Sequence, residues 1–419
     1  MAQVIKKKPA YTIPTMKEIE SLPWNGFNVV STFSGCGGSC LGYRMAGFKV
    51  LWANEFVASA KASYKRNHPN SFLDPRDIKL VQAKEILNEL KLKPGQIDLF
   101  DGSPPCQAFS TAGQRQKGWN KARKYDGGVT QCNEQMFDEY IRLLKGLQPK
   151  VFIAENVSGL IKGTAKGYFL EILQALKACG YQVKVKLLDA QWLGVPQMRQ
   201  RTIFIGVRND LGLEPCFPLP FSYRYTVADA ISYIEYMYKG GGFGQVKKVK
   251  ANAFPYECVG TSPEKGNGLS GKIYVKKKFI HDTSGLFTKG DITNIPCPTV
   301  TGTPHLFVEE EAKSPPWARQ EYDRLKEGET SKTHFAMHRT HRNKPCPAVT
   351  GPCGSSLHHP TEKRRFSIQE LKRICAFPED FVLEGSYAQQ WKCLGNSVPP
   401  LMMKAIASSV LEGILKKLK

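Results

Sequence analysis

Residues 102–110, GSPPCQAFS, place a cysteine directly after two prolines. Each proline fixes its own φ and restricts the residue before it, so the backbone leading to Cys106 has few accessible conformations. The run IDLFDG at 97–102 precedes it and is typical of an apolar strand that ends in a polar turn. Most free cysteines are small buried hydrophobic residues. A thiol held rigidly where a strand ends is better suited to nucleophilic chemistry, which makes Cys106 a candidate nucleophile.

A carboxylate and two arginines further along the chain could assist such a nucleophile. Glu155 directly follows the strand-like run KVFIA, where a carboxylate is costly to leave unpaired. It is either a solvated charge at a strand end or a general acid. Arg199 and Arg201 lie two residues apart at the start of another strand-like run, so both face the same side. Paired arginines clamp a phosphate or a carboxylate such as Glu155, or they are simply surface charge.

A glycine-rich turn near the N-terminus is typical of a site for a nucleoside-containing cofactor. FSGCGG, residues 33–38, ends a strand-like run and opens a helical pattern, so its glycines let a ligand approach the helix N-terminus. Glu55 follows Gly35 by 20 residues, where a carboxylate can accept hydrogen bonds from ribose hydroxyls. The third glycine of a dinucleotide fingerprint would fall on Cys40, which disfavours a nicotinamide cofactor. Asp77, expected at the end of the third strand, either accepts from an adenine amino group or caps a turn.

Composition limits which kinds of binding partner and which cellular compartment are plausible for this chain. The formal net charge is +22, and residues 239–290 contain ten lysines against three acidic residues, interleaved with glycine and aromatic residues. This pattern favours phosphate contacts over membrane binding, because it does not form an amphipathic helix. No apolar run approaches the roughly 18 residues of a membrane span. Twelve cysteines without a CxxC pair argue against a zinc ribbon or a disulfide scaffold, which indicates a reducing, cytosolic compartment.

The elements that must position these residues alternate between strands and helices over residues 27–210. This alternation predicts a doubly wound α/β domain, with a mostly parallel sheet and helices on both faces. YQVKVKLLDA and RTIFIGV follow each other without an intervening helix, so we expect an antiparallel edge there. The expected catalytic and cofactor-binding domain covers 1–208, and the chain returns to it at 386–419.

Between these parts, residues 209–385 are expected to form a basic, β-rich target-recognition domain. They are rich in proline, glycine and lysine and show little helical periodicity. NIPCPTVTG at 294–302 recurs as NKPCPAVTG at 343–351. Two copies are too few for a solenoid, so we interpret them as two equivalent strand-and-turn elements.

Seven motifs, in this order, resemble the DNA (cytosine-5) methyltransferase family of prokaryotic or phage type. They are FSGCGG, ANE, GSPPCQAFS, ENVSGL, GVPQMRQRTIFIG, RRFSIQELKRICAFPEDF and GNSVPP, and they cover nearly the whole chain. Cys36 stands where the family more often has an aliphatic residue, and the insertion at 118–135 lengthens the loop after Cys106. The resemblance implies a doubly wound mixed sheet of the S-adenosylmethionine-dependent methyltransferase type with a second, target-recognition domain.

The resemblance also implies a mechanism. Carbon 5 of cytosine is a weak nucleophile, and adding a thiolate at carbon 6 makes an enamine that takes a methyl group from S-adenosylmethionine. Cys106 would form that covalent bond, and Glu155 would hold and protonate ring nitrogen 3. Arg201 would contact the carbonyl oxygen of the base, with Arg199 supporting the site. The cytosine must leave the stacked duplex for this reaction, so the enzyme would flip it.

Cofactor residues are implied motif by motif. The glycine-rich turn would line the methionine and adenine side, Glu55 would take the ribose, and GNSVPP would close the pocket. The set assigned to S-adenosylmethionine is Phe33, Gly35, Gly37, Gly38, Glu55, Phe56, Asp77, Ile78, Pro104 and Asn396. His334, His338 and His341 follow a helical spacing, but without an acidic or cysteine partner nearby we expect no metal site.

The expected function is methylation of carbon 5 of cytosine in a specific double-stranded DNA sequence, as part of a restriction-modification system or as an orphan methylase. A monomer would act on DNA in the cytoplasm, associated with the nucleoid, and a cognate restriction endonuclease would act separately. Two alternatives are an RNA cytosine-5 methyltransferase and a catalytically silent DNA-binding regulator on the same fold. The long basic region disfavours the first. Retention of Cys106, Glu155 and both arginines disfavours the second.

Overall fold

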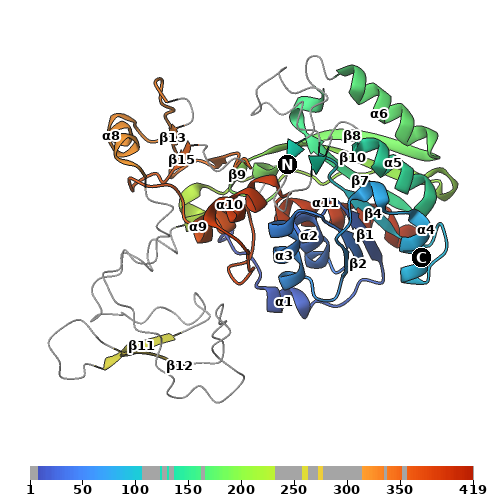
Figure 1. Ribbon diagram of the computed structural model, residues 1–419, viewed down its shortest axis with the longest axis horizontal. Coiled ribbons are helices and arrows are strands. Elements are labelled where there is room, and N and C mark those ends of the chain that lie inside the picture. Colours follow the sequence, from blue (N-terminus) through green and yellow to red (C-terminus); the bar gives the residue numbers. More distant parts are fainter. Residues whose placement is uncertain are drawn as a thin grey trace, which may run out of the picture. The chain divides into compact units, whose positions relative to one another are not determined.

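The computed structural model describes residues 8–105, 136–161, 166–231, 314–334, 337–351 and 356–418, together with short strands at 123–124, 130–131, 257–262 and 272–276 (Figure 1). The chain divides into two compact units, Met1–Ala230 with Ser314–Lys419, and Ile231–Lys313. In the second unit the described residues form one antiparallel pair, β11 (Glu257–Ser262) with β12 (Lys272–Lys276). The lysine-rich segment 239–290 belongs to this unit.

The first unit is built on a seven-stranded mixed sheet in the order β3-β2-β1-β4-β7-β10-β8. The strands are β1 (Asn28–Thr32), β2 (Lys49–Asn54), β3 (Phe72–Asp74), β4 (Leu99–Gly102), β7 (Val151–Val157), β8 (Tyr181–Asp189) and β10 (Gln200–Arg208). The strands from β3 to β7 are parallel, whereas β10 is antiparallel to both of its neighbours and β8 forms the edge. The predicted mixed sheet and its antiparallel end are confirmed.

Alternating side chains of the strands pack into two cores, one on each face of the sheet. Val29 faces the core that contains residues of α2 (Gly38–Met45) and α11 (Pro400–Gly413). Its neighbour Val30 faces the opposite core, which contains residues of α4 (Ala83–Leu90), α5 (Met136–Leu147) and α6 (Lys166–Ala178). Helices therefore cover both faces, as the doubly wound prediction requires (Figure 1).

The C-terminal segment completes the first core. At Gly42 of α2, a Cβ atom would lie 2.5 Å from the Cβ of Met403 on α11, so only glycine allows this close approach. The segment Tyr387–Leu418, which contains α10 (Tyr387–Asn396) and α11, is long and apolar enough to cross a membrane by composition alone. However, 61% of its most apolar stretch is buried inside the protein, which is the behaviour of core helices.

The segment after Ser314 also packs within the first unit. It contains α8 (Pro316–Arg324), α9 (Ile368–Ile374), and β13 (Met337–Arg339) paired in parallel with β15 (Ser356–His358). Because His338 lies on a strand, the three histidines at 334–341 do not lie together on one helix, although their spacing in the sequence would allow it.

The second PCP-containing repeat contributes β14 (Cys346–Pro347), which pairs in parallel with β9 (Gln197–Met198). The first repeat lies outside the described residues. The assignment of 209–385 to target recognition stays a prediction.

Candidate active site

Loops from five adjacent strands meet at one edge of the sheet. The parallel strands β2, β1, β4 and β7 present their carboxyl ends there, and residues 55–57, 33–38 and 103–105 follow the first three. Residues 155–157 are the last three of β7, so Glu155 lies within this strand and does not follow it as expected. Because β10 runs antiparallel, its first residues lie at the same edge, with Arg201 opposite Val157. This edge is where open α/β sheets bind ligands. Cys106 itself lies outside the described residues, which end at Pro105 before the loop.

Glu155 and Arg201 form an ion pair at this edge, with 2.6 Å between Oε1 and Nε. Their side chains are 9% and 15% exposed, so water screens the pair only weakly. The pairing follows from the register, because Ile203 lies opposite Glu155 and Arg201 is two residues further along the same face. The carboxylate is thus paired, and only a narrow side of it remains open to a ligand.

Arg199 has a different environment from Arg201. It is 2% exposed, and its two terminal nitrogens donate to the carbonyl oxygens of Val349 (2.7 Å) and Gly395 (2.8 Å). Its Nε is buried without a hydrogen-bond partner in the described part of the chain. Burial, with a smaller contribution from Arg201, lowers the pKa of Arg199 to about 9. Arg199 therefore joins the second repeat and the GNSVPP segment to the sheet, and makes no hydrogen bond to Glu155.

The glycine-rich turn is held to the end of β2 by Glu55. The Gly35 N–H donates to Oε2 of Glu55 at 2.8 Å, and the Val57 N–H donates to Oε1 at 2.7 Å. Burial raises the pKa of Glu55, and the backbone donors partly oppose that rise. Each carboxylate oxygen can accept a further hydrogen bond. Glu55 thus fixes the turn while keeping acceptor capacity for a ligand.

The three glycines of this turn are required for different reasons. Gly35 has a left-handed φ of +57°, and a Cβ there would meet nothing within 4 Å, so the backbone borders open space. At Gly37 (φ +98°) a Cβ would lie 2.2 Å from Nε2 of the buried His68. At Gly38 it would lie 2.5 Å from the carbonyl oxygen of Val398. Only Gly35 leaves room for a ligand. Packing alone explains the other two.

The residues expected around adenine are less regular than predicted. β3 ends at Asp74, so the prediction that Asp77 ends the third strand is wrong. Asp77 instead caps a short 3-10 helix, Ile78–Leu80, and accepts from the Lys79 N–H at 3.0 Å. Ile78 is 1% exposed and packs in the core, whereas Phe56 is half-buried. A contact of Asp77 or Ile78 with adenine stays a prediction.

Two further contacts connect the motifs. Asn156, beside Glu155, donates from its Nδ2 to the carbonyl oxygen of Pro104 at 3.2 Å and so joins the ENV and PPC segments. Asn396 ends α10 and packs against the second repeat, since a Cβ at Gly351 would lie 2.3 Å from its Oδ1. Phe33, with a φ of +53°, is half-buried at the start of the glycine-rich turn.

Sequence reasoning missed a buried carboxyl group behind this edge. Asp101 of β4 is 1% exposed, and it accepts from the Ser31 hydroxyl at 2.8 Å and the Tyr43 hydroxyl at 2.9 Å. Burial, with a smaller contribution from Glu155, raises the pKa of Asp101 to about 7. The available signal was an aspartate within the otherwise apolar run IDLFDG. Among the described residues, no cluster of His, Cys, Asp or Glu has the arrangement of a metal site.

Known proteins are similar to this chain in sequence. The type II methyltransferase M1.HphI of Haemophilus parahaemolyticus is 30% identical over 386 residues, which cover 91% of this chain and 86% of that protein. The type II methyltransferase M.NgoPII of Neisseria gonorrhoeae is 36% identical over 203 residues, 48% of this chain and 54% of that protein.

Solved structures and a family model extend the comparison. A crystal structure of an E. coli prophage protein, described as a DNA modification methyltransferase, superposes with a TM-score of 0.63. The superposition covers 93% of this chain and 100% of the prophage protein at 23% sequence identity, which shows that the two share a fold. The model of the C-5 cytosine-specific DNA methylase family matches residues 27–412. Because this match includes the whole sheet and the returning C-terminal helix, the chain belongs to the C-5 cytosine-specific DNA methylase family.

Proposed function

We propose that this protein transfers a methyl group from S-adenosylmethionine to carbon 5 of a cytosine in a specific double-stranded DNA sequence. The observation that carries the proposal is the buried ion pair of Glu155 and Arg201. It lies beside Asn156, which binds the backbone of Pro104, two residues before Cys106. An oriented carboxylate, an arginine and a thiol that follows Pro104 by two residues in the chain are the groups needed to activate a cytosine ring.

The residues at the edge of the sheet fit S-adenosylmethionine. Gly35 borders open space, and Glu55 keeps acceptor capacity in a buried position suited to ribose hydroxyls. The first N–H groups of α2 add donors for the carboxylate of the methionine part. When bound, S-adenosylmethionine supplies an electrophilic methyl group on its sulfonium.

Side chains of the protein carry out the other steps of the reaction, and each has its own role. Cys106 adds its sulfur to carbon 6, and the proton that its thiol loses passes through the Glu155 carboxylate to ring nitrogen 3, so that carbon 5 becomes nucleophilic. Arg201 keeps Glu155 oriented through its Nε and has further N–H groups for the carbonyl oxygen of the base. After methylation, water takes the proton from carbon 5, the electron pair of that bond re-forms the double bond to carbon 6, and the sulfur leaves as the Cys106 thiolate. Ring nitrogen 3 returns its proton to Glu155. Because both side chains of the pair are nearly buried, the cytosine has to leave the duplex stack to reach them.

Methylation of a randomised duplex library, read by bisulfite sequencing, tests this proposal. We expect protection of one cytosine within one short sequence and none without S-adenosylmethionine. Preferential methylation of a tRNA supplied in the same reaction would favour the RNA alternative. The monomeric state, a separate cognate nuclease, association with the nucleoid and the recognition role of 209–385 belong to the same proposal, and each needs its own measurement.

A further inference from the structure

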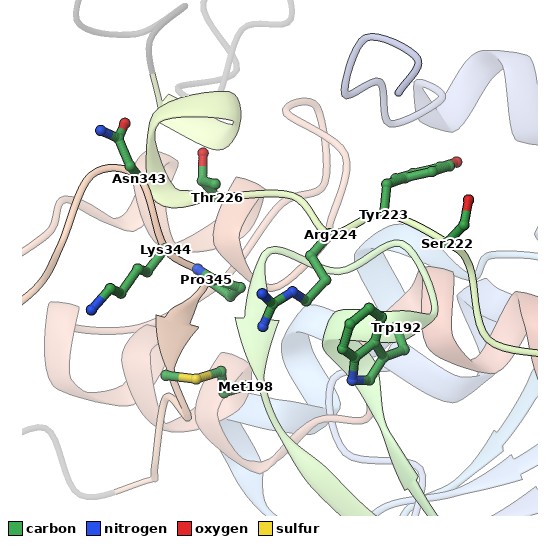
Figure 2. A pocket seen from close by; sticks show the side chains of 9 residues that line it. All are labelled: Trp192, Met198, Ser222, Tyr223, Arg224, Thr226, Asn343, Lys344 and Pro345. Carbon is green, nitrogen blue, oxygen red and sulfur yellow. The ribbon is translucent and has the colours of Figure 1, made fainter. Parts of the chain in front are cut away.

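A pocket of about 520 Å³ opens in the first unit, outside the groups assigned to catalysis (Figure 2). Three segments far apart in the sequence line it: Trp192 and Met198 around β9, the loop 222–226, and residues 343–345 at the start of the second repeat. Trp192 is 37% exposed and Met198 is 40% exposed. The pocket is therefore a surface feature that a large ligand can reach.

The pocket lies beyond the carboxyl edge of the sheet. Arg201 at the start of β10 is opposite Val157 at the end of β7, so the residues before β10 extend past that edge. Met198 precedes Arg201 by three residues, which limits their Cα separation to about 10 Å. A duplex carries a phosphate every 3.4 Å of axis on each strand, so roughly three phosphates per strand lie within that distance. A DNA strand whose cytosine reaches Arg201 thus passes close to this pocket.

The charge of the pocket is positive. Arg224 and Lys344 are both exposed and contribute two cations, and none of the nine lining residues is an aspartate or glutamate. Within the described residues, the Lys344 ammonium makes no ion pair or side-chain hydrogen bond. Exposed lysines are often solvated, but Lys344 lines the same pocket as Arg224 (Figure 2). Such a pair attracts an anion with several oxygen atoms.

Arg224 is oriented before any ligand binds. Its Nη1 donates to Oε1 of Gln191 at 3.1 Å, and Gln191 in turn donates from Nε2 to Asp189 at 2.8 Å. Its guanidinium lies over the ring of Trp192, 4.8 Å from the centroid (Figure 2). These contacts use Nη1 and one face of the Arg224 guanidinium, so its other N–H groups remain available to donate to a ligand. The planar guanidinium, held in this way, can donate two parallel hydrogen bonds to two oxygens of one phosphate.

We propose that this pocket binds a phosphodiester group of the substrate DNA close to the methylated cytosine, through Arg224 and Lys344. The inference rests on the proposed function, and it adds a contact that anchors the strand without reading its sequence. It also gives the second repeat a role at its first residues, since Lys344 lies two residues before β14. Trp192 takes part only by holding Arg224.

The test combines a protein variant with a change in the DNA. We would measure the affinity of Lys344→Gln for a duplex that the protein methylates, over a series of salt concentrations. The matched control is Lys93→Gln, an exposed lysine that precedes β4 and so lies toward the opposite, amino edge of the sheet. We expect Lys344→Gln to bind roughly three- to tenfold more weakly at low salt, with a salt slope smaller by about 0.9, and Lys93→Gln to match the wild type.

Replacing single phosphates near the target by neutral methylphosphonates then identifies the partner. At one position, the methylphosphonate should weaken DNA binding by the wild type but should not weaken binding by Lys344→Gln any further. The inference is overturned if the two lysine variants bind alike, or if every methylphosphonate costs Lys344→Gln as much as it costs the wild type. Methylation of the duplex by the wild type is measured in parallel. Its absence would contradict the proposed function itself, whereas normal methylation with equal binding of both variants would reject only this pocket.

Discussion

Arg201 and Glu155 are paired across two antiparallel strands, with their polar atoms 2.6 Å apart, although they lie 46 positions apart in the chain. The neighbouring Arg199 takes no part in this pair and binds two backbone carbonyls instead. The two arginines of this motif therefore have different roles. Arg201 orients a carboxylate, and Arg199 holds together segments that are distant in the sequence. These roles lead to different expected outcomes for their variants.

Removing one member of the ion pair leaves the other charge buried and unpaired. Arg201→Gln and Glu155→Gln are each expected to lower the free energy of unfolding by about 3 kcal/mol. The double variant should lose less than the sum of the two, because it leaves no uncompensated charge. Urea unfolding of the four proteins measures this coupling. Strictly additive losses would mean that the pair does not stabilise the fold as a unit.

Arg199→Lys keeps the positive charge but can no longer bind both carbonyl groups with one planar fork. We expect it to lower the free energy of unfolding by about 2 kcal/mol and to reduce methylation of every DNA sequence in the same proportion. Arg342→Lys, at an exposed arginine paired with Glu327, is the control and should change little. Thermal unfolding and library methylation give the two readouts. A change of sequence preference in Arg199→Lys would contradict a purely structural role.

Glu55→Gln replaces one carboxylate oxygen by an NH₂ group, which cannot accept from the Gly35 or Val57 N–H. We expect S-adenosylmethionine to bind more weakly by about 1–3 kcal/mol, while DNA affinity without cofactor stays the same. Calorimetry of both ligands checks this expectation. Glu20→Gln, at a half-exposed surface glutamate, serves as the control. Unchanged cofactor affinity in Glu55→Gln would remove Glu55 from the cofactor site.

The proposed nucleophile is tested by covalent trapping. A duplex with 5-fluorocytosine at the target should form an SDS-stable complex, because fluorine cannot leave as a proton does. Cys106→Ala is expected to abolish the complex, whereas Cys216→Ala, at another free cysteine, should retain it. Denaturing gel electrophoresis separates the two results. An adduct that persists in Cys106→Ala would assign the covalent step to another residue.

Asp101 makes stability depend on pH. Its pKa of about 7 in the folded protein lies above the value of about 3.9 in an unfolded chain. Between these values the folded state binds more protons than the unfolded state, so the free energy of unfolding should fall as pH rises from about 4 to about 7 and level off above. Asp101→Asn should lose this part of the pH dependence, worth a few kcal/mol. Urea unfolding at pH 5 and pH 8 measures it, and Asp323→Asn on the surface is the control. An unchanged pH slope in Asp101→Asn would place the titration elsewhere.

The sheet could be predicted because strand and helix periods differ along the sequence, and because the connection between β8 and β10 contains no α-helix. From the sequence, Arg199 and Arg201 could bind a phosphate, bind a carboxylate such as Glu155, or be surface charge. In the structure Arg201 pairs with Glu155. The expectation that Asp77 ends a strand is wrong because β3 already ends at Asp74, and Asp77 caps the short 3-10 helix that follows.

Other contacts had no signal in the sequence. The partners of Arg199 are backbone carbonyls 150 and 196 positions away, and every residue type carries a carbonyl. The bond from Ser31 to Asp101 depends on the register of β1 with β4, in which these two residues lie opposite each other. Such contacts follow from the fold once it is known.

The contact of Gly42 with Met403 has a consequence for how the protein is made in the cell. One core contains Val29 and Val50 from the start of the chain together with Met402, Ile406 and Val410 from its end. While the ribosome is still translating, the part of this core that α11 covers in the folded protein stays exposed to water. Nascent chains therefore need protection from aggregation until residues 402–415 have emerged. A premature stop shortly before that point would yield a chain that carries every proposed catalytic group and still does not fold.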